Sequence, residues 1–157
     1  MNAWPADNDA AITRYFGPIG AEANLVLIEP PYPMVLAWDT TKPLRKIRCH
    51  GLVAPSLRRV LASLAALYTP AELVEHGLDR WGGCYNVRKM RGSLGRWSRH
   101  SWGIAVDLDP ARNGLRTPWP GEATMPLAVV EAFEAEGWLS GGRAWGCDAM
   151  HVQATST

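Results

Sequence analysis

Two short segments of the chain combine histidine and aspartate in a way that suits metal binding. In the first, His100 and Asp107 lie seven residues apart in an otherwise apolar stretch, and in the second, Asp148 precedes His151 by three residues. Apolar strands normally exclude such groups, because a buried charge needs a metal ion or a partner. Two pairs of this kind predict side chains that are buried together around a metal ion.

The local geometry of the first segment decides whether both of its side chains can reach one ion. Residues seven apart point to opposite faces of a regular strand. Gly103 lies between His100 and Asp107 and permits a bulge or bend, which would bring His100 round from the strand entrance. Beyond the bend, we expect Ala105, Asp107 and Asp109 to share the working face.

The second segment is predicted to be a strand. Asp148 and His151 would share one face of a helix, but Gly146 indicates a turn, and the alternation after it favours a final strand over residues 145–154. His151 would then point to one side of this strand, with Asp148 above it.

Together the segments offer the ligands of a catalytic zinc ion. His100, Asp107 and His151 would supply two imidazoles and one carboxylate, and a catalytic zinc site keeps its fourth position for water. Asp148 remains as a base. Taken singly, each residue is more typical of a hydrogen-bonded core histidine or of a turn aspartate, so the prediction depends on their combination.

Strands and helices are predicted to alternate along the chain and to position these residues. We expect a short helix between Asp9 and Gly17, helices over residues 55–68 and 126–136, and a helical turn or loop over 73–78. Strands are expected over residues 24–28, 34–38, 46–50, 84–90, 102–108 and 145–154. This order predicts one α+β domain over residues 1–157, with helices packed on a mainly antiparallel sheet that carries the zinc site.

Composition and charge exclude several other classes of protein. The 157 residues carry 16 Lys and Arg against 15 Asp and Glu, so a net charge of +1 gives no strong field for nucleic acid or an anionic membrane. Apolar runs fall short of the ~20 residues of a membrane span. The first residues lack the pattern of a secretory signal, so we expect synthesis in the cytoplasm. The three cysteines are expected to be reduced and mostly buried.

The motifs resemble those of a known enzyme family. The pattern Ser-x-His-x-x-Gly-x-Ala-x-Asp at residues 98–107, followed by Asp-x-x-His at Asp148 and His151, resembles the zinc peptidases of peptidoglycan. These include D-alanyl-D-alanine carboxypeptidases and phage L-alanyl-D-glutamate endopeptidases. The resemblance extends to Tyr-Asn-Val-Arg at residues 85–88 and Arg-Gly at 91–92. It implies the hedgehog/D-Ala-D-Ala peptidase-like fold.

The resemblance also implies roles for individual residues. The three ligand candidates would hold one Zn²⁺ ion, Asp148 would be the catalytic base, and Arg88 would contact the substrate or the oxyanion, with Arg91 close by in the sequence. An aspartate base favours the endopeptidase branch, because the carboxypeptidases usually carry Glu followed by Trp-His. Val152 departs from that branch, where an aromatic residue is common.

The expected function is therefore that of a zinc metallopeptidase that cleaves the stem peptide of peptidoglycan, as an endolysin-type L-alanyl-D-glutamate endopeptidase. A D-alanyl-D-alanine carboxypeptidase and an inactive wall-binding zinc domain are the alternatives. The resemblance to phage endolysins implies a phage or prophage origin, action on the wall after release, and a holin as a partner. We expect a monomer.

Other chemistry-bearing residues have plainer interpretations. A thiol hydrolase would use Cys84 or Cys147 with a nearby histidine, but it would leave Asp107 idle. Arg96 and Arg99 are expected in a solvated basic loop. The expected places of the tryptophans are the core for Trp38, Trp102, Trp138 and Trp145, and loops that border a cleft for Trp97 and Trp119.

Overall fold

The structure, a computed structural model, describes residues 3–92 and 95–157. Its helices are α1 (Asp9–Phe16), α2 (Ala54–Leu67), α3 (Pro70–Glu75), α4 (Leu127–Ala135) and α5 (Gly141–Trp145), with 3₁₀ turns η1 (Glu22–Asn24) and η2 (Arg99–Trp102). Its strands are β1 (Leu25–Ile28), β2 (Met34–Leu36), β3 (Asp39–Leu44), β4 (Ile47–His50), β5 (Arg80–Gly83), β6 (Ala105–Leu108), β7 (Leu139–Ser140) and β8 (His151–Gln153). The predicted α+β fold is confirmed.

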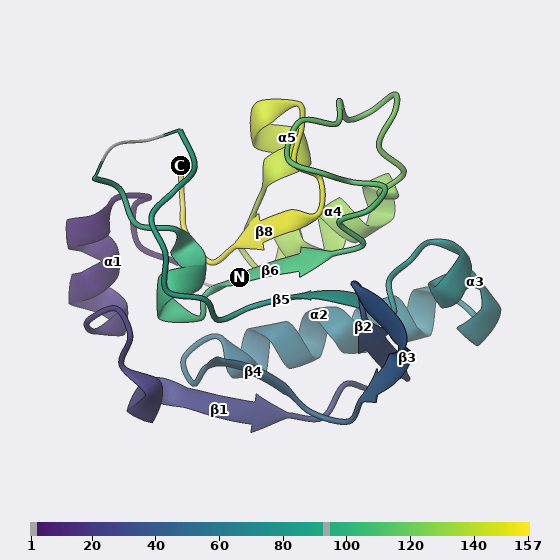
Figure 1. Cartoon of the computed structure of the whole chain (residues 1–157), viewed down its shortest axis with the longest axis horizontal. Helices are drawn as coiled ribbons and strands as arrows, with labels where there is room; N and C mark the ends of the chain where they lie inside the picture. The colour runs from purple at the N-terminus through teal and green to yellow at the C-terminus, as the bar shows by residue number, and fades with distance from the viewer. Residues whose placement is uncertain (1–2, 93–94) are drawn as a thin grey trace.

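The strands form two sheets (Figure 1). The larger sheet has the order β3-β2-β5-β6-β8-β7, and its neighbours are antiparallel except for the parallel pair β2 and β5. β1 and β4 form a separate antiparallel pair. The proline-rich residues 29–33 separate β1 from β2, as expected from the inability of proline to donate to a ladder. The prediction of a mainly antiparallel sheet is therefore confirmed.

The two longer helices pack against each other and build the core. α2 presents Leu57, Leu61 and Leu64 inward at helical spacing, and α4 presents Val130 and Phe133. Each such side chain contributes about 1.5–3 kcal/mol when it is removed from water. α2 and α4 contact each other, and α4 also contacts β7 at the edge of the larger sheet. The two helices thus pack together and support the edge of the larger sheet at β7.

One predicted strand forms earlier in the chain than expected. Residues 84–90 were expected to be a strand, but β5 occupies Arg80–Gly83 instead. Gly82 allows this pairing, because a Cβ atom there would lie 2.9 Å from Cβ of Asp107. The segment after β5 bonds to the η2 region: Asn86 N–H donates to the His100 carbonyl at 3.0 Å, and Ser98 N–H donates to the Arg88 carbonyl at 2.9 Å.

The predicted strands over 102–108 and 145–154 are shorter than expected, because each is preceded by a turn of helix. Ser98 caps η2, which ends at Gly103 in the left-handed conformation (φ 74°), and only then does β6 begin. α5 ends at Gly146, which is also left-handed (φ 70°), and β8 starts five residues later at His151. The predicted bend at Gly103 is confirmed.

Two tryptophans and one strand were predicted wrongly. Trp102 and Trp138 are buried as expected, but Trp38 is 70% exposed and Trp145 is 48% exposed. β3 was not predicted, because its Thr-Thr-Lys-Pro sequence is polar and mostly exposed at the edge of the sheet, where burial does not constrain the pattern.

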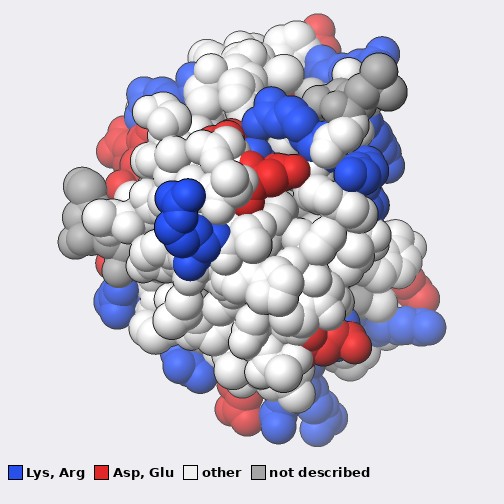
Figure 2. Space-filling model, turned by 90° about the vertical axis from the view of Figure 1, so that its left-hand side faces the viewer, with Lys and Arg blue, Asp and Glu red and all other residues white. Residues whose placement is uncertain are grey.

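The surface carries charges of both signs. On the face that Figure 2 presents, basic and acidic side chains are scattered over a larger uncharged area. Among the described residues, no helix is both long enough and apolar enough to cross a lipid bilayer.

Candidate metal centre

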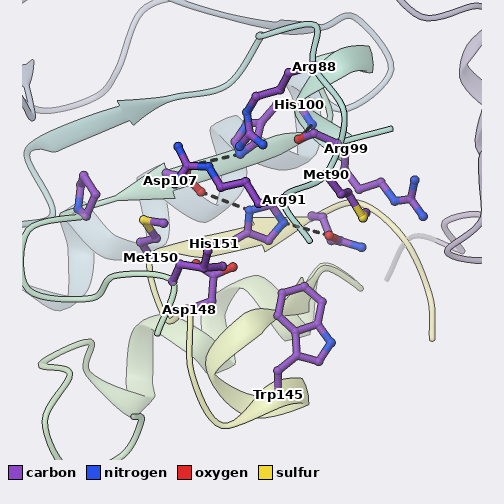
Figure 3. Close-up of a pocket in the computed structure, with 14 residues that line it drawn as sticks. Arg88, Met90, Arg91, Arg99, His100, Asp107, Trp145, Asp148, Met150 and His151 are labelled. Carbon is purple, nitrogen blue, oxygen red and sulfur yellow. Dashed lines mark hydrogen bonds and ion pairs between the residues drawn. The ribbon is translucent and has the colours of Figure 1, made fainter. Parts of the chain in front are cut away.

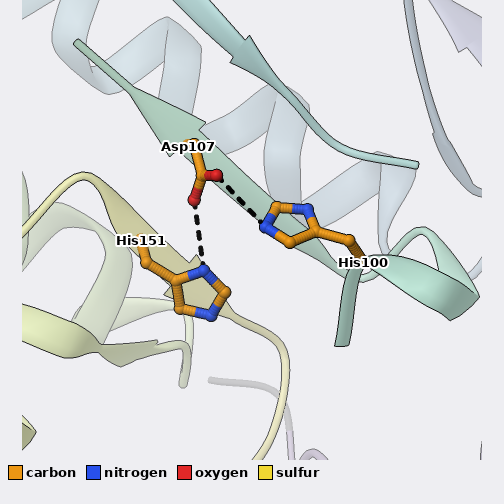
Figure 4. Close-up of side chains that lie close together, drawn as sticks. All are labelled: His100, Asp107 and His151. Carbon is orange, nitrogen blue, oxygen red and sulfur yellow. Dashed lines mark hydrogen bonds and ion pairs between the residues drawn. The ribbon is translucent and has the colours of Figure 1, made fainter. Parts of the chain in front are cut away.

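Strand pairing brings the two predicted segments together. β6 and β8 are antiparallel neighbours, and Asp107 lies directly opposite His151 in their register. His100 reaches the same place from η2, which precedes β6 (Figure 4). His100 Nε2 lies 3.2 Å from Asp107 Oδ2, and His151 Nδ1 lies 3.1 Å from Asp107 Oδ1. The structure therefore brings together all three ligand candidates.

The donor set fits a zinc ion. One ligand atom from each of His100, Asp107 and His151 lies within 4.8 Å of the others. His100 Nε2 is buried and has no directed hydrogen bond among the described residues, although Asp107 is near. Two imidazoles with one carboxylate are a donor set that catalytic zinc accepts, and the partnerless nitrogen is what a ligand position requires.

The second nitrogen of each imidazole has a partner behind the cluster. His100 Nδ1 lies 2.7 Å from the Cys84 carbonyl, and His151 Nε2 lies 2.8 Å from Gln153 Oε1. A carbonyl oxygen only accepts, so each of these nitrogens donates. This leaves the other nitrogen of each ring, His100 Nε2 and His151 Nδ1, on the side of Asp107.

Burial and pairing act in opposite directions on the charges of the cluster. Burial disfavours the Asp107 carboxylate, but the nearby imidazoles of His100 and His151 outweigh it and hold the pKa of Asp107 well below its usual value. Burial likewise disfavours a charged His151, yet the hydrogen bond to Asp107 and its charge raise the pKa of His151. The carboxylate is thus held in the ionised form that binds metal.

Asp148 lies beside this cluster in the turn before β8. It is buried, its Oδ1 has no hydrogen-bond partner among the described residues, and burial raises the pKa of its carboxyl group. Its backbone is in the left-handed region (φ 59°), which aspartate tolerates better than most residues. The structure therefore places a free carboxylate oxygen next to the three ligand candidates.

A cavity of about 400 Å³ opens over these residues (Figure 3). Its wall includes the three ligand candidates, Asp148, and the cationic side chains of Arg88 and Arg91. The apolar part of the wall comprises Met90, Pro110, Leu115, Trp145 and Met150. Both arginines line the cavity, so position alone does not separate Arg88 from Arg91. Arg88 lies close enough to Asp148 for its charge to favour the carboxylate.

Two cavity residues were not identified as functional from the sequence. Trp145, expected in the core, stacks on His151 with ring centroids 5.9 Å apart and an interplanar angle of 29°. Its position at the end of α5, just before Gly146, carries no signal for this contact. Gln153 hydrogen-bonds His151, and the alternation that places both side chains on one face of β8 is the signal that could have found it.

Arg99 contradicts the prediction of a solvated loop residue. It is only 1% exposed, and its guanidinium donates to Asp7 Oδ1 and Asp9 Oδ1, each at 2.6 Å, and to the Trp97 carbonyl at 2.9 Å. A buried arginine requires such partners. Arg99 therefore ties η2, and with it His100, to the residues that begin α1.

Asp109 also contradicts its prediction. It was expected on the working face with Asp107, but it lies beyond the end of β6 with a left-handed backbone (φ 50°) and is fully buried. Its Oδ2 accepts a hydrogen bond from Arg112 at 2.7 Å. It does not line the cavity that contains the three ligand candidates.

The cysteines are free, and two of them, Cys49 and Cys84, are buried. Burial raises the pKa of the Cys84 thiol well above its usual value, so the nucleophilic thiolate is disfavoured. Cys84 contributes its backbone carbonyl to His100 instead. The geometry therefore gives no support to a thiol hydrolase that uses Cys84.

Comparison with known proteins agrees with the geometry. Residues 91–154 match a family model described as D-alanyl-D-alanine carboxypeptidase, and the peptidases of this family are zinc-dependent hydrolases. The comparisons with curated proteins and with solved structures found no match. The resemblance inferred from the motifs is confirmed: the segment that carries all three ligand candidates and Asp148 matches the D-alanyl-D-alanine carboxypeptidase-like family of zinc peptidases.

Proposed function

We propose that this protein is a zinc peptidase that hydrolyses the stem peptide of bacterial peptidoglycan, as an L-alanyl-D-glutamate endopeptidase. The observation that carries the proposal is the meeting of two imidazoles and a carboxylate in one cavity, beside the Asp148 carboxylate, whose Oδ1 has no hydrogen-bond partner among the described residues. The endopeptidase branch is favoured by the aspartate at position 148. The printed family description favours a second candidate, a D-alanyl-D-alanine carboxypeptidase.

The three ligand candidates would hold one zinc ion. When bound, this ion supplies a Lewis acid that makes water more acidic and polarises the scissile carbonyl. His100, Asp107 and His151 contribute a net charge of −1 when both imidazoles are neutral, so the centre would keep a positive charge toward the substrate. Their backbone partners in η2, β6 and β8 hold them in place.

Asp148 would move the proton. Asp148 lines the cavity, its Oδ1 has no hydrogen-bond partner among the described residues, and burial makes the carboxylate a stronger base than an exposed one. It would accept a proton from the attacking water at this oxygen and pass it to the amine that leaves. No covalent bond between the protein and the peptide is required.

The arginines and the apolar wall would bind the substrate. Arg88 or Arg91 would pair with a substrate carboxylate or with the oxyanion that develops on the scissile carbonyl. Trp145 and Leu115 offer apolar surface on the same cavity, against which the backbone and methyl groups of a short peptide can pack.

Digestion of purified muropeptides with the zinc-loaded chain, followed by mass analysis, tests the proposal. A released peptide that begins with D-glutamate supports the endopeptidase, and free D-alanine supports the carboxypeptidase instead. Absence of any product from zinc-loaded protein contradicts both activities and favours a wall-binding zinc domain.

The endolysin role adds a biological expectation. The enzyme would be made in the cytoplasm and would reach the wall only after release, with a holin as the partner that opens the membrane. Co-expression with a holin should lyse a bacterial host, whereas expression of either protein alone should not lyse it within the same time. Lysis by the peptidase alone would contradict the need for a holin.

A further inference from the structure

A short chain of buried polar groups lies behind His151. His151 Nε2 lies 2.8 Å from Gln153 Oε1, and Gln153 Nε2 lies 2.7 Å from Thr155 Oγ1. Gln153 is 1% exposed and Thr155 is fully buried. Buried amides and hydroxyls are costly unless they are paired, so these contacts fix the side chains of all three residues.

The strand arrangement makes room for this chain. His151 and Gln153 are two residues apart in β8 and therefore point to the same face. Opposite them on β6 stand Asp107, which faces His151, and Ala105, which faces Gln153. The small side chain of Ala105 leaves space for the glutamine amide beside the metal centre.

The direction of the hydrogen bonds determines which nitrogen of His151 can face an ion. The Gln153 NH₂ group donates to the Thr155 hydroxyl, which turns the amide oxygen toward His151. That oxygen can only accept, so His151 Nε2 carries a hydrogen. A neutral imidazole with hydrogen on Nε2 has its lone pair on Nδ1, and Nδ1 is the nitrogen on the side of Asp107.

The two histidines thus differ in the kind of group that accepts their second hydrogen bond. For His100 the partner is the backbone carbonyl of Cys84, which cannot reverse its polarity. For His151 the partner is a side-chain amide, which would present NH₂ instead of oxygen if it rotated by half a turn. Only the second arrangement needs a further residue to fix the direction of the amide, and Thr155 is placed to do so.

We propose that Gln153 and Thr155 are positioning residues that hold His151 in the Nε2–H tautomer with Nδ1 turned toward the metal. The inference rests on the proposed zinc centre and extends it by two residues that act through His151. Partners of this kind affect metal affinity strongly, because they fix both the tautomer and the ring orientation of the ligand.

Paired substitutions test the role of the amide oxygen. Gln153→Leu removes the acceptor at similar size and should weaken zinc binding by about 10–100-fold. Gln153→Glu keeps an oxygen acceptor and should keep zinc affinity near that of the native chain. Zinc affinity is measured by competition with a chromophoric chelator. Equal losses in the two variants, or native affinity in Gln153→Leu, would overturn the proposal.

A second pair tests Thr155. Thr155→Val has the same shape without the hydroxyl and should lower zinc affinity, whereas Thr155→Ser retains the hydroxyl and should preserve it. Thermal unfolding of the metal-free variants shows whether each still folds. A Thr155→Val variant that folds and binds zinc like the native chain contradicts the part assigned to Thr155.

A measurement on the native chain needs no variant. In ¹⁵N NMR spectra of the histidine rings, His151 should show a slowly exchanging hydrogen on Nε2 both without and with zinc, and the zinc-induced shift should fall on Nδ1. A zinc-loaded His151 with its hydrogen on Nδ1 would overturn the proposal. Zinc binding with the expected tautomer but no cleavage of muropeptides would support the positioning role and contradict the peptidase.

Discussion

Asp148 combines burial with a backbone conformation that few residues adopt. Its φ of 59° lies in the left-handed region, and its carboxylate oxygen Oδ1 lacks a hydrogen-bond partner among the described residues. Both features are costly to folding. Such costs are typical of positions that serve chemistry, and the tight turn before β8 is what aims the side chain at the cavity.

Substitution of Asp148 by asparagine should separate metal binding from turnover. Asparagine has the same shape and also tolerates the left-handed backbone, so the turn should remain intact. The variant loses the base and should retain zinc while its kcat falls by about 10²–10⁴-fold. Zinc content and muropeptide hydrolysis are measured on the same preparation. A variant with native kcat would remove Asp148 from the proposed role.

Trp145 is expected to act on the substrate through its exposed face. One face of the indole stacks on His151 and about half of the side chain is open to solvent at the cavity. Trp145→Ala should raise KM by about two- to tenfold, since an aromatic contact contributes about 0.5–1.5 kcal/mol. Trp145→Phe, which keeps an aromatic ring, is the matched control and should lie closer to the native KM. A loss confined to kcat would contradict this role.

The sequence predicted which side chains of the two motifs would come together better than it predicted the surroundings of Trp145 and Arg99. The four residues of the two motifs could be predicted because histidine and aspartate in apolar segments are unusual. The contact of Trp145 with His151 and the burial of Arg99 could not be predicted, because both depend on partners that are distant in the sequence or in another element.

At the scale of elements, η2 is held in place by the residues that begin α1. Arg99 is buried and paired with Asp7 and Asp9, and the next residue in η2 is the ligand candidate His100. The buried guanidinium of Arg99 stabilises the fold only while its carboxylate partners are present. Arg99 lies 92 and 90 residues after these two aspartates, so the N-terminal segment helps to position a ligand candidate that is distant in the sequence.

Removal of both acidic partners should destabilise the protein. The double variant Asp7→Asn, Asp9→Asn leaves Arg99 buried without a counter-charge, which should cost about 3–5 kcal/mol in urea unfolding. Zinc affinity should fall as well, because His100 loses its support. Asp39→Asn, which weakens an exposed 4.0 Å pair with Lys42, is the control and should change stability by less than about 0.5 kcal/mol. A double variant as stable as the control would contradict the argument.

Elements with a strong side-chain period were predicted well, and elements defined by their neighbours were not. The helices expected over residues 55–68 and 126–136 correspond to α2 and α4 within one residue at each end. The prediction of a strand over residues 84–90 was wrong, because pairing with a neighbour decides which segment becomes a strand. Gly82 allows β5 to lie against Asp107. A short pattern alone cannot show which of two adjacent segments will pair.

At the scale of the whole molecule, one polar cluster connects distant parts of the core. Glu136, just after α4, accepts hydrogen bonds from Arg59 and Ser56 of α2, and Ser56 accepts one from Trp138. The backbone carbonyl of Glu136 accepts a hydrogen bond from the indole N–H of Trp4. The helices that support the sheet are thus joined to each other and to the N-terminal segment.

This cluster predicts a pH dependence of stability. Hydrogen bonds from Arg59 hold the pKa of Glu136 below its usual value. A carboxyl group whose pKa is lower in the folded state than in the unfolded state stabilises the fold above its unfolded pKa and loses this effect as the pH falls through the folded value. Glu136→Gln should lower Tm by roughly a few degrees at pH 7, and the difference from the native chain should shrink toward pH 3. A difference that does not depend on pH would contradict this origin.

The convergence of the two motifs is a property of the whole fold. Spacing alone could suggest that His100 and Asp107 share an ion, but the adjacency of β6 and β8 that places Asp107 opposite His151 is set by the order of the sheet. The occurrence of two histidine–aspartate pairs in apolar segments supplied the expectation that they meet, and both the resemblance to zinc peptidases and the family match over residues 91–154 agree with it.

Metal analysis tests the central claim most directly. The purified chain, dialysed against zinc and then against metal-free buffer, should retain one zinc ion per chain, and His151→Ala should retain far less while remaining folded. Removal of the metal with a chelator should abolish muropeptide cleavage, and zinc should restore it. A native chain that retains no zinc, or that cleaves muropeptides equally well in the presence of the chelator, would contradict the account.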